Sequence, residues 1–165
     1  MLIFTIISQI PYDLFLQASI PGAAFQLNIG ATLTTGLLAL YVIDEIKHPA
    51  IKIPLLLILF WISMVIPMDY NSYGFLAIVI FYILKDSKLL HSVGYAILLL
   101  FYSYTQGSTF NIPAILALIP IFLYNGKKGR SMKYLFYAFY PLHMLAITYV
   151  ISLLNWNKHS KNKIY

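Results

Sequence analysis

The chain is a succession of apolar stretches that carry almost no charge. Charged residues make up 10% of its 165 residues, whereas soluble domains carry roughly 25%. Five acidic and eleven basic side chains are too few to surround a core of this size with a polar shell. The sequence therefore predicts an all-α, polytopic helical membrane protein with about six transmembrane helices. The candidate spans are Leu27–Ile46, Ile53–Met68, Met68–Leu84, Leu89–Tyr104, Phe110–Tyr124 and Tyr134–Leu154.

These spans are expected to form a single membrane domain over residues 1–165. The expected parts are a partial helix at 1–10, an extracytoplasmic loop at 11–26, a transmembrane bundle at 27–154 and a polar basic tail at 155–165. The third span is the weakest, because Asp69 and Asn71 stand at its start. Its dense apolar part, Tyr73–Leu84, covers about 18 Å of a bilayer core about 30 Å thick. A re-entrant segment is the alternative for this span.

The basic residues indicate which loops face the cytoplasm. If all six segments cross the membrane, three loops on one side hold eight of the eleven bases. These bases are Lys47, Lys52, Lys85, Lys88, Lys127, Lys128, Arg130 and Lys133. The loops at 69–72 and 106–109 hold none, and Lys and Arg collect on the cytoplasmic side. The tail lysines, at 158, 161 and 163, would then lie outside, so either the tail is an exception or one segment does not cross.

His143 is expected near mid-membrane, because it follows Lys133 by ten residues, about 15 Å along a helix. Tyr140 shares its helix face, and Pro141 frees a backbone carbonyl one turn back. An imidazole there can serve as a general base, because its pKa is tunable near neutrality. The ordinary alternative is a neutral histidine bonded to a tyrosine hydroxyl or to the freed carbonyl.

Other polar residues have ordinary explanations. Asn28, Thr32, Thr34, Thr35 and Gly36 give the first full span a polar outer half, as helix packing requires; a cavity open to water or substrate is the alternative.

The two carboxylates at the outer boundary, Asp13 and Asp69, are expected to be solvated. His48, His91 and His159 show no metal-ligand spacing, and the chain has no cysteine, so no metal site is predicted.

The most distinctive loop string is Tyr124–Arg130, in which Asn-Gly favours a tight turn and several bases follow. It does not have the spacing of a P-loop. As an ordinary feature it is a positive-inside anchor or a contact with anionic membrane lipid. As a functional feature it is a phosphate grip for a nucleotide-bearing donor. The residues of this grip are Asn125, Gly126, Lys127, Lys128 and Arg130.

Four strings resemble the TraX family, in matching order. They are Ile7–Leu14 (ISQIPYDL), Leu37–Asp44 (LLALYVID), Tyr124–Gly129 (YNGKKG) and Lys133–Leu145 (KYLFYAFYPLHML). TraX proteins are bacterial integral-membrane proteins whose founding member acetylates the N-terminus of conjugative pilin. They are similar to integral-membrane acyltransferases that take acetyl groups from cytosolic acetyl-CoA. The most specific piece is Phe-Tyr-Pro-Leu-His, at 139–143.

The resemblance implies a role for each matching position. His143 is the implied base and Tyr140 the implied donor to the oxyanion, while the loop motif binds acetyl-CoA and no metal is needed. Ser8, Gln9, Pro11 and Asp13 fall on the family's early motif. The implied location is the bacterial cytoplasmic (inner) membrane, multi-pass. The implied acceptor is a pilin-like or other surface protein, and no nucleic acid is involved.

Family members usually carry further helices upstream of the Ser8–Pro11 string, with an Asp-His pair that looks catalytic. The chain starts at Met1, so we expect the C-terminal part of a larger bundle. The expected function is that of a TraX-like membrane acetyltransferase, or of a truncated and inactive form of one. The alternative is a small non-enzymatic membrane protein, either a permease subunit or an assembly factor for surface structures.

Overall fold

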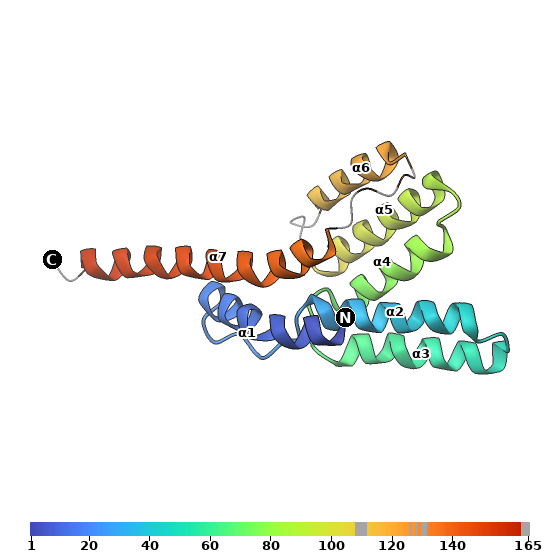
Figure 1. Ribbon diagram of the computed structural model, residues 1–165, viewed down its shortest axis with the longest axis horizontal. Helices are drawn as coiled ribbons and strands as arrows, with labels where there is room; N and C mark the ends of the chain where they lie inside the picture. The colour runs from blue at the N-terminus through green and yellow to red at the C-terminus, as the bar shows by residue number, and fades with distance from the viewer. Residues whose placement is uncertain (108–111, 126, 128, 130–131, 163–165) are drawn as a thin grey trace. The chain divides into compact units, whose positions relative to one another are not determined.

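The computed structural model describes residues 1–107, 112–125, 127, 129 and 132–162, and Figure 1 shows their helices. The helices are α1 (Leu2–Ser19), α2 (Ile29–Glu45), α3 (Pro49–Val65), α4 (Asn71–Ile83), α5 (Lys88–Thr105), the 3₁₀ helix η1 (Ile112–Ala117), α6 (Leu118–Leu123) and α7 (Lys133–Asn162). These described residues form no strand, so the all-α prediction is confirmed.

One helical segment of the described chain is long and apolar enough to cross a membrane. It is Tyr134–Trp156 of α7, with 23 residues and a mean hydropathy of 1.5. The apolar helices at Pro49–Val65, Asn71–Ile83 and Pro113–Leu123 are shorter. The expected number of about six spans therefore stays a prediction.

The chain divides into two compact units, which we describe separately. Unit 1 consists of Met1–Ala31 and Arg130–Tyr165, and unit 2 of Thr32–Gly129. Unit 1 thus holds α1 and α7, and unit 2 holds most of α2 together with α3 to α6.

In unit 1, α1 is longer than the sequence predicted. It continues through Pro11 to Ser19, so the first part of the expected loop at 11–26 is helical. A proline inside a helix removes one hydrogen bond. Contacts on both sides of Pro11 hold the helix here: Gln9 donates to the Gln26 carbonyl at 2.8 Å, and the Tyr12 hydroxyl donates to the Gln26 side chain at 3.1 Å.

Asn28 binds the start of α2 to α1. Its side-chain amide donates to the Thr5 carbonyl at 2.7 Å and to Gln9 Oε1 at 3.1 Å, and Asn28 is fully buried. Gln9 also donates to the Asp13 carboxylate at 2.8 Å, so Asp13 is not simply solvated as expected. A Cβ at Gly30 would collide with the Thr5 hydroxyl, so this close approach needs glycine. The polar start of the first span therefore serves helix packing here.

In unit 2, α4 packs against both α3 and α5. It also approaches α2 closely, because a Cβ at Gly36 of α2 would overlap the Ile78 side chain of α4. Near the start of α4, a Cβ at Gly74 would lie 2.6 Å from Thr32 Cγ2. Small residues thus let these two helices lie in contact, as is usual for helices in membranes.

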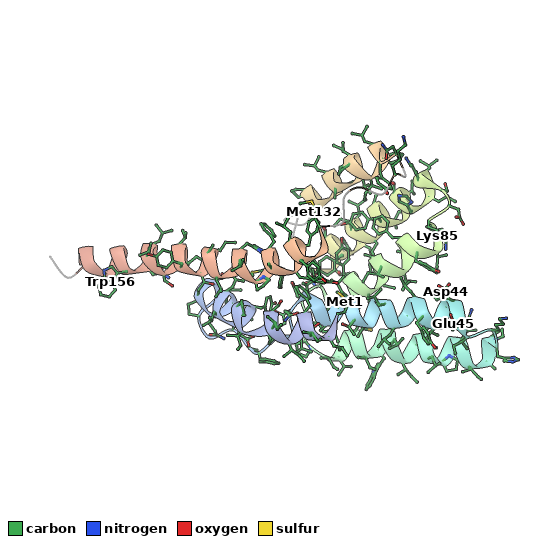
Figure 2. All side chains as sticks on the ribbon, in the orientation of Figure 1. Met1, Asp44, Glu45, Lys85, Met132 and Trp156 are labelled. Carbon is green, nitrogen blue, oxygen red and sulfur yellow. The ribbon has the colours of Figure 1, made fainter. Side chains whose placement is uncertain are left out.

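The connectors that carry the basic residues lie at one end of unit 2, which we call the basic end (Lys47, Lys52, Lys85, Lys88 and Lys127). The ends of α2 and α4 meet there, because the Tyr82 hydroxyl donates to both Asp44 carboxylate oxygens at 2.5 Å. The start of α5 meets the end of α6, because Lys88 Nζ donates to the Tyr124 carbonyl at 2.6 Å. Figure 2 shows Asp44, Glu45 and Lys85 at this end. The membrane side of this end stays a prediction.

Candidate functional site

The side chain of His143 contacts residues of its own helix, α7. Its Nδ1 lies 3.0 Å from the Phe139 carbonyl oxygen, one turn earlier on α7. The imidazole stacks on the Phe139 ring, with centroids 5.0 Å apart and an interplanar angle of 12°. It also meets the Tyr140 ring edge-on at 5.5 Å. Three contacts therefore fix the orientation of the ring.

The hydrogen bond to Phe139 determines which nitrogen of His143 is basic. A carbonyl oxygen only accepts, so Nδ1 carries the proton, and in a neutral ring the lone pair stays on Nε2. This carbonyl differs from the predicted one: Pro141 frees the carbonyl of Tyr137, not that of Phe139. The imidazole thus has a structural bond on one nitrogen and a basic position on the other.

Tyr140 lies beside His143, as the helical spacing predicted. Its ring also contacts Phe4 of α1, with centroids 5.5 Å apart, and Phe4 contacts Tyr137 at 5.4 Å. The Tyr140 hydroxyl is buried, so a substrate oxygen reaches it only if the ring moves. The predicted contact with an oxyanion therefore requires such a movement.

An apolar pocket of about 330 Å³ lies between α1 and α7. Its volume falls in the range of small-molecule sites. Phe4 and Tyr137 line it and connect it to the Tyr140 ring, so it is next to the His143 turn. The lining residues are Met1, Ile3, Phe4, Ile7, Tyr134 and Tyr137.

The early motif is placed in the interior of unit 1. Ser8 and Pro11 are buried, and Ser8 Oγ makes no hydrogen bond to a residue that the structure describes. Gln9 and Asp13 bond to each other as described above. These contacts stabilise α1 and its connection to α2, and they give the motif a structural role.

The loop after α6 begins with a turn at Asn125 and Lys127. Asn125 Oδ1 accepts from the Lys127 amide at 3.0 Å, which forms the turn that Asn-Gly predicted. The Tyr124 hydroxyl donates to the Lys127 carbonyl at 3.2 Å. Of the predicted phosphate grip, Asn125 and Lys127 are therefore in one turn. The other three candidates, Gly126, Lys128 and Arg130, lie outside the described residues.

Lys88 is a residue of this loop site that the sequence did not reveal. Its ammonium donates to the carbonyls of Phe122, at 3.2 Å, and Tyr124, at 2.6 Å. These carbonyls lie at the end of α6, where unsatisfied carbonyls attract a cation. Because the partners are backbone atoms, no sequence motif could have identified the contact.

Asp69 differs from its expected environment. Asp69 was expected to be solvated, but it is half-buried, and burial raises the pKa of its carboxyl despite a hydrogen bond from the Tyr70 backbone. His91 lies buried in the first turn of α5, against the Phe81 ring. Within the described ranges, no group of three or more His, Cys, Asp and Glu could hold a metal ion.

Comparison with known families identifies one match. A family model described as TraX protein matches residues 1–152, which confirms the resemblance inferred from the four strings. No curated protein and no solved structure matches the chain.

Proposed function

Because the chain belongs to the TraX family, we propose that it is a membrane acetyltransferase. In this proposal it transfers an acetyl group from cytosolic acetyl-CoA to a protein N-terminus or to another amine or hydroxyl acceptor. The observation that carries the proposal is the hydrogen bond from His143 Nδ1 to the Phe139 carbonyl. It leaves Nε2 as an oriented base on the family's most specific string.

The proposed reaction needs such a base. The acceptor nitrogen attacks the acetyl carbonyl carbon, a C–N bond forms, and the C–S bond to coenzyme A breaks. The attacking amine must lose a proton, which His143 Nε2 accepts and passes to the departing sulfur, so the products are an acetylated amine and free CoA thiol. Tyr140 is the proposed hydrogen-bond donor to the oxygen that gains charge. The apolar pocket beside Phe4 offers space for an apolar group of the substrate.

The proposed donor site is the basic end of unit 2. The turn at Asn125 and Lys127 supports it, because the bond from the Lys127 amide to Asn125 fixes the backbone of a residue whose side chain carries a positive charge. Lys128 and Arg130 follow directly in the sequence and add charge for the phosphates of acetyl-CoA. Lys88 is a positioning residue, because it holds the carbonyl of Tyr124 at the start of the turn.

We further propose a multi-pass arrangement in the bacterial inner membrane, with helices as the crossing segments and the turns outside them. The family is membrane-associated, and one helix is long enough to cross. The grouping of the basic connectors at one end of unit 2 supports a common cytoplasmic side for them.

The decisive experiment measures release of free CoA by the purified full chain in detergent, with acetyl-CoA and a peptide that has a free N-terminus. We expect release from the wild type and loss of about 100-fold or more in His143→Ala, because general bases contribute that much. His48→Ala is the matched control, since His48 is exposed before α3 and should keep full activity. Absence of release from the wild type would favour a permease subunit or an assembly factor instead. Full activity of His143→Ala would give His143 a structural role only.

A further inference from the structure

Four tyrosines form a cluster that begins at the end of unit 2 opposite the basic end and reaches Tyr95 near the middle of α5. We call this region the turn end (Thr32, Asp69, Tyr70, Tyr73, Tyr95 and Tyr102). The Tyr73 ring stacks on Tyr102, with centroids 4.5 Å apart and an angle of 21°. It lies 6.4 Å from the Tyr70 ring and 6.5 Å from the Tyr95 ring. The Tyr73 hydroxyl donates to that of Tyr95 at 3.1 Å. Rings from the turn, from α4 and from α5 thus form one aromatic cluster.

The turn that carries Tyr70 also carries the carboxyl group of Asp69. Asp69 is half-buried and forms no ion pair with any residue in the described part of the chain. The sequence supplies no base nearby either, since the stretches 69–72 and 106–109 contain no Lys or Arg. Burial and next the charge of Asp69 raise the pKa of Tyr70, as expected for a negative charge beside that ring. A half-buried negative charge of this kind is stabilised by a cation that arrives from outside.

The backbone holds Tyr70 in a conformation that bulky residues rarely adopt. Its φ is 65°, and that of Asn71 is 39°, both in the left-handed region. The turn is fixed on two sides. The Asn71 side chain accepts from the Met68 amide at 2.8 Å, and the Thr32 hydroxyl donates to the Asp69 carbonyl. These bonds hold the Tyr70 ring, 51% exposed, next to the Asp69 carboxyl. Such conformations concentrate at ligand sites.

We propose that the turn end of unit 2 binds an ammonium group, held by the Asp69 carboxylate and by the face of the exposed Tyr70 ring. Aromatic faces attract cations, and tyrosine rings next to a carboxylate attract them most when the site is partly desolvated. Exposure of Tyr70 leaves the site accessible. The identification of this ammonium as that of the acceptor rests on the proposed function, whereas the binding itself does not.

The pH dependence of binding follows from the groups that face the site. Burial raises the pKa of Asp69 and also that of Tyr70, and the other titratable groups there are Tyr73, Tyr95 and Tyr102. The carboxylate form of Asp69 is needed for binding. Binding therefore strengthens as pH rises through the raised pKa of Asp69, and weakens again where the ammonium loses its proton.

The experiment compares three fluorescent peptides of one length on the full chain in detergent, by anisotropy at pH 7.5. The first is lysine-free with a free N-terminus, the second is the same peptide with an acetylated N-terminus, and the third is N-acetylated with one lysine. We expect the first to bind about tenfold more tightly than the second. The third separates the two sources of an ammonium group, since its binding assigns the site to lysine side chains as well. Equal binding of all three would overturn the proposal.

Variants connect the binding to the named residues. Asp69→Asn should lose about tenfold in affinity for the first peptide, and Tyr70→Leu should weaken it less. Tyr70→Phe retains the ring and should bind as the wild type does. Asp86→Asn is the matched control, because Asp86 is exposed in the connector between α4 and α5. Wild-type affinity in Asp69→Asn would also overturn the proposal.

If Asp69→Asn does not fold, the comparison of the first two peptides on the wild type decides alone. Peptide binding without CoA release would contradict the proposed acetyltransferase but not the ammonium site. CoA release with equal binding of the free and acetylated peptides would contradict the ammonium site but not the proposed acetyltransferase.

Discussion

The two ends of unit 2 differ in charge and in how their polar groups are satisfied. At the basic end, ammonium groups donate to backbone carbonyls, as Lys88 does to Tyr124 and Lys52 does to Ile43 at 2.7 Å. At the turn end, the stretches 69–72 and 106–109 contain no Lys or Arg, and Asp69 lies among tyrosines in a strained turn. Both helices α2 and α4 run from one end to the other. The same pair of helices therefore connects an end rich in lysine to an end that carries a half-buried carboxylate.

This difference shows how few residues divide a small apolar unit into two chemical environments. The cations at the basic end lie at helix ends and in loops, where carbonyls and water solvate them. The carboxylate at the turn end is solvated less, because the turn folds back on Thr32. We expect an anionic donor to bind at the first end and an amine at the second.

The largest effect is expected at the contact between α2 and α4, because both ends depend on it. Gly36→Leu places a side chain where Ile78 lies, and it should destabilise unit 2 by about 3 kcal/mol, as overpacking does. Binding at both ends should fall together. Thermal unfolding in detergent measures the first effect, and binding of CoA and of the free-N-terminus peptide measures the second. Leu37→Phe, at the exposed neighbouring position, is the control and should change neither.

Neutralising the loop should affect only the basic end. The triple variant Lys127→Ala, Lys128→Ala and Arg130→Ala should weaken acetyl-CoA binding by about tenfold, or about 1.4 kcal/mol, because three phosphate-binding charges are lost. Affinity for the acceptor peptide should stay at the wild-type value. Titration of each ligand against the variant measures both quantities. Unchanged affinity for acetyl-CoA would contradict the phosphate grip.

Removing Lys88 should loosen the same loop with a smaller effect on the donor. Lys88→Met loses the bonds to Phe122 and Tyr124, so trypsin should cleave after Lys127 faster than in the wild type. KM for acetyl-CoA should rise about threefold while kcat stays nearly constant, since Lys88 acts only through the loop. Lys88→Arg, which keeps a positive charge at this position, should restore both. Equal proteolysis of the wild type and Lys88→Met would exclude the positioning role.

The smallest effect concerns the stability of the turn end. Because burial raises the pKa of Asp69 in the folded state, its ionisation opposes folding. The stabilisation present at low pH is lost as pH rises through the raised pKa. Asp69→Asn, which stays neutral, should therefore unfold about 2 °C above the wild type at pH 8 and close to it at pH 4. A melting temperature below that of the wild type at pH 8 would contradict the penalty on the charged carboxyl.

Apolar runs and turn residues were sufficient to predict most helices. The span predicted at Leu89–Tyr104 is α5, and the one at Leu27–Ile46 is α2, with ends that differ by only a few residues. The span at Phe110–Tyr124 is instead divided into η1 and α6, and prolines stand in both segments. The continuation of α1 through Pro11 was missed, because a bond from Gln9 to Gln26 and a bond from Asn28 to Thr5 stabilise it over a long sequence separation.

The candidate site was predictable only where it lies on one helix. Helical spacing places Tyr140 next to His143, and the ring contact agrees. The contact of Phe4 with Tyr140 joins segments far apart in the sequence, and Lys88 bonds to backbone carbonyls. Neither contact could therefore be predicted from the types of residue involved. The burial of Asp69 depends on the left-handed turn at Tyr70, which no residue preference indicates.

The shortness of α4 has a consequence for the surrounding lipid. Its 13 residues extend about 20 Å, whereas the hydrocarbon core of a bilayer measures about 30 Å. A crossing helix of this length produces hydrophobic mismatch, so the headgroups on one or both sides must sink toward it. Thinning at the Asp69 side would bring interfacial water down to the tyrosines and would shorten the path of an incoming polypeptide end.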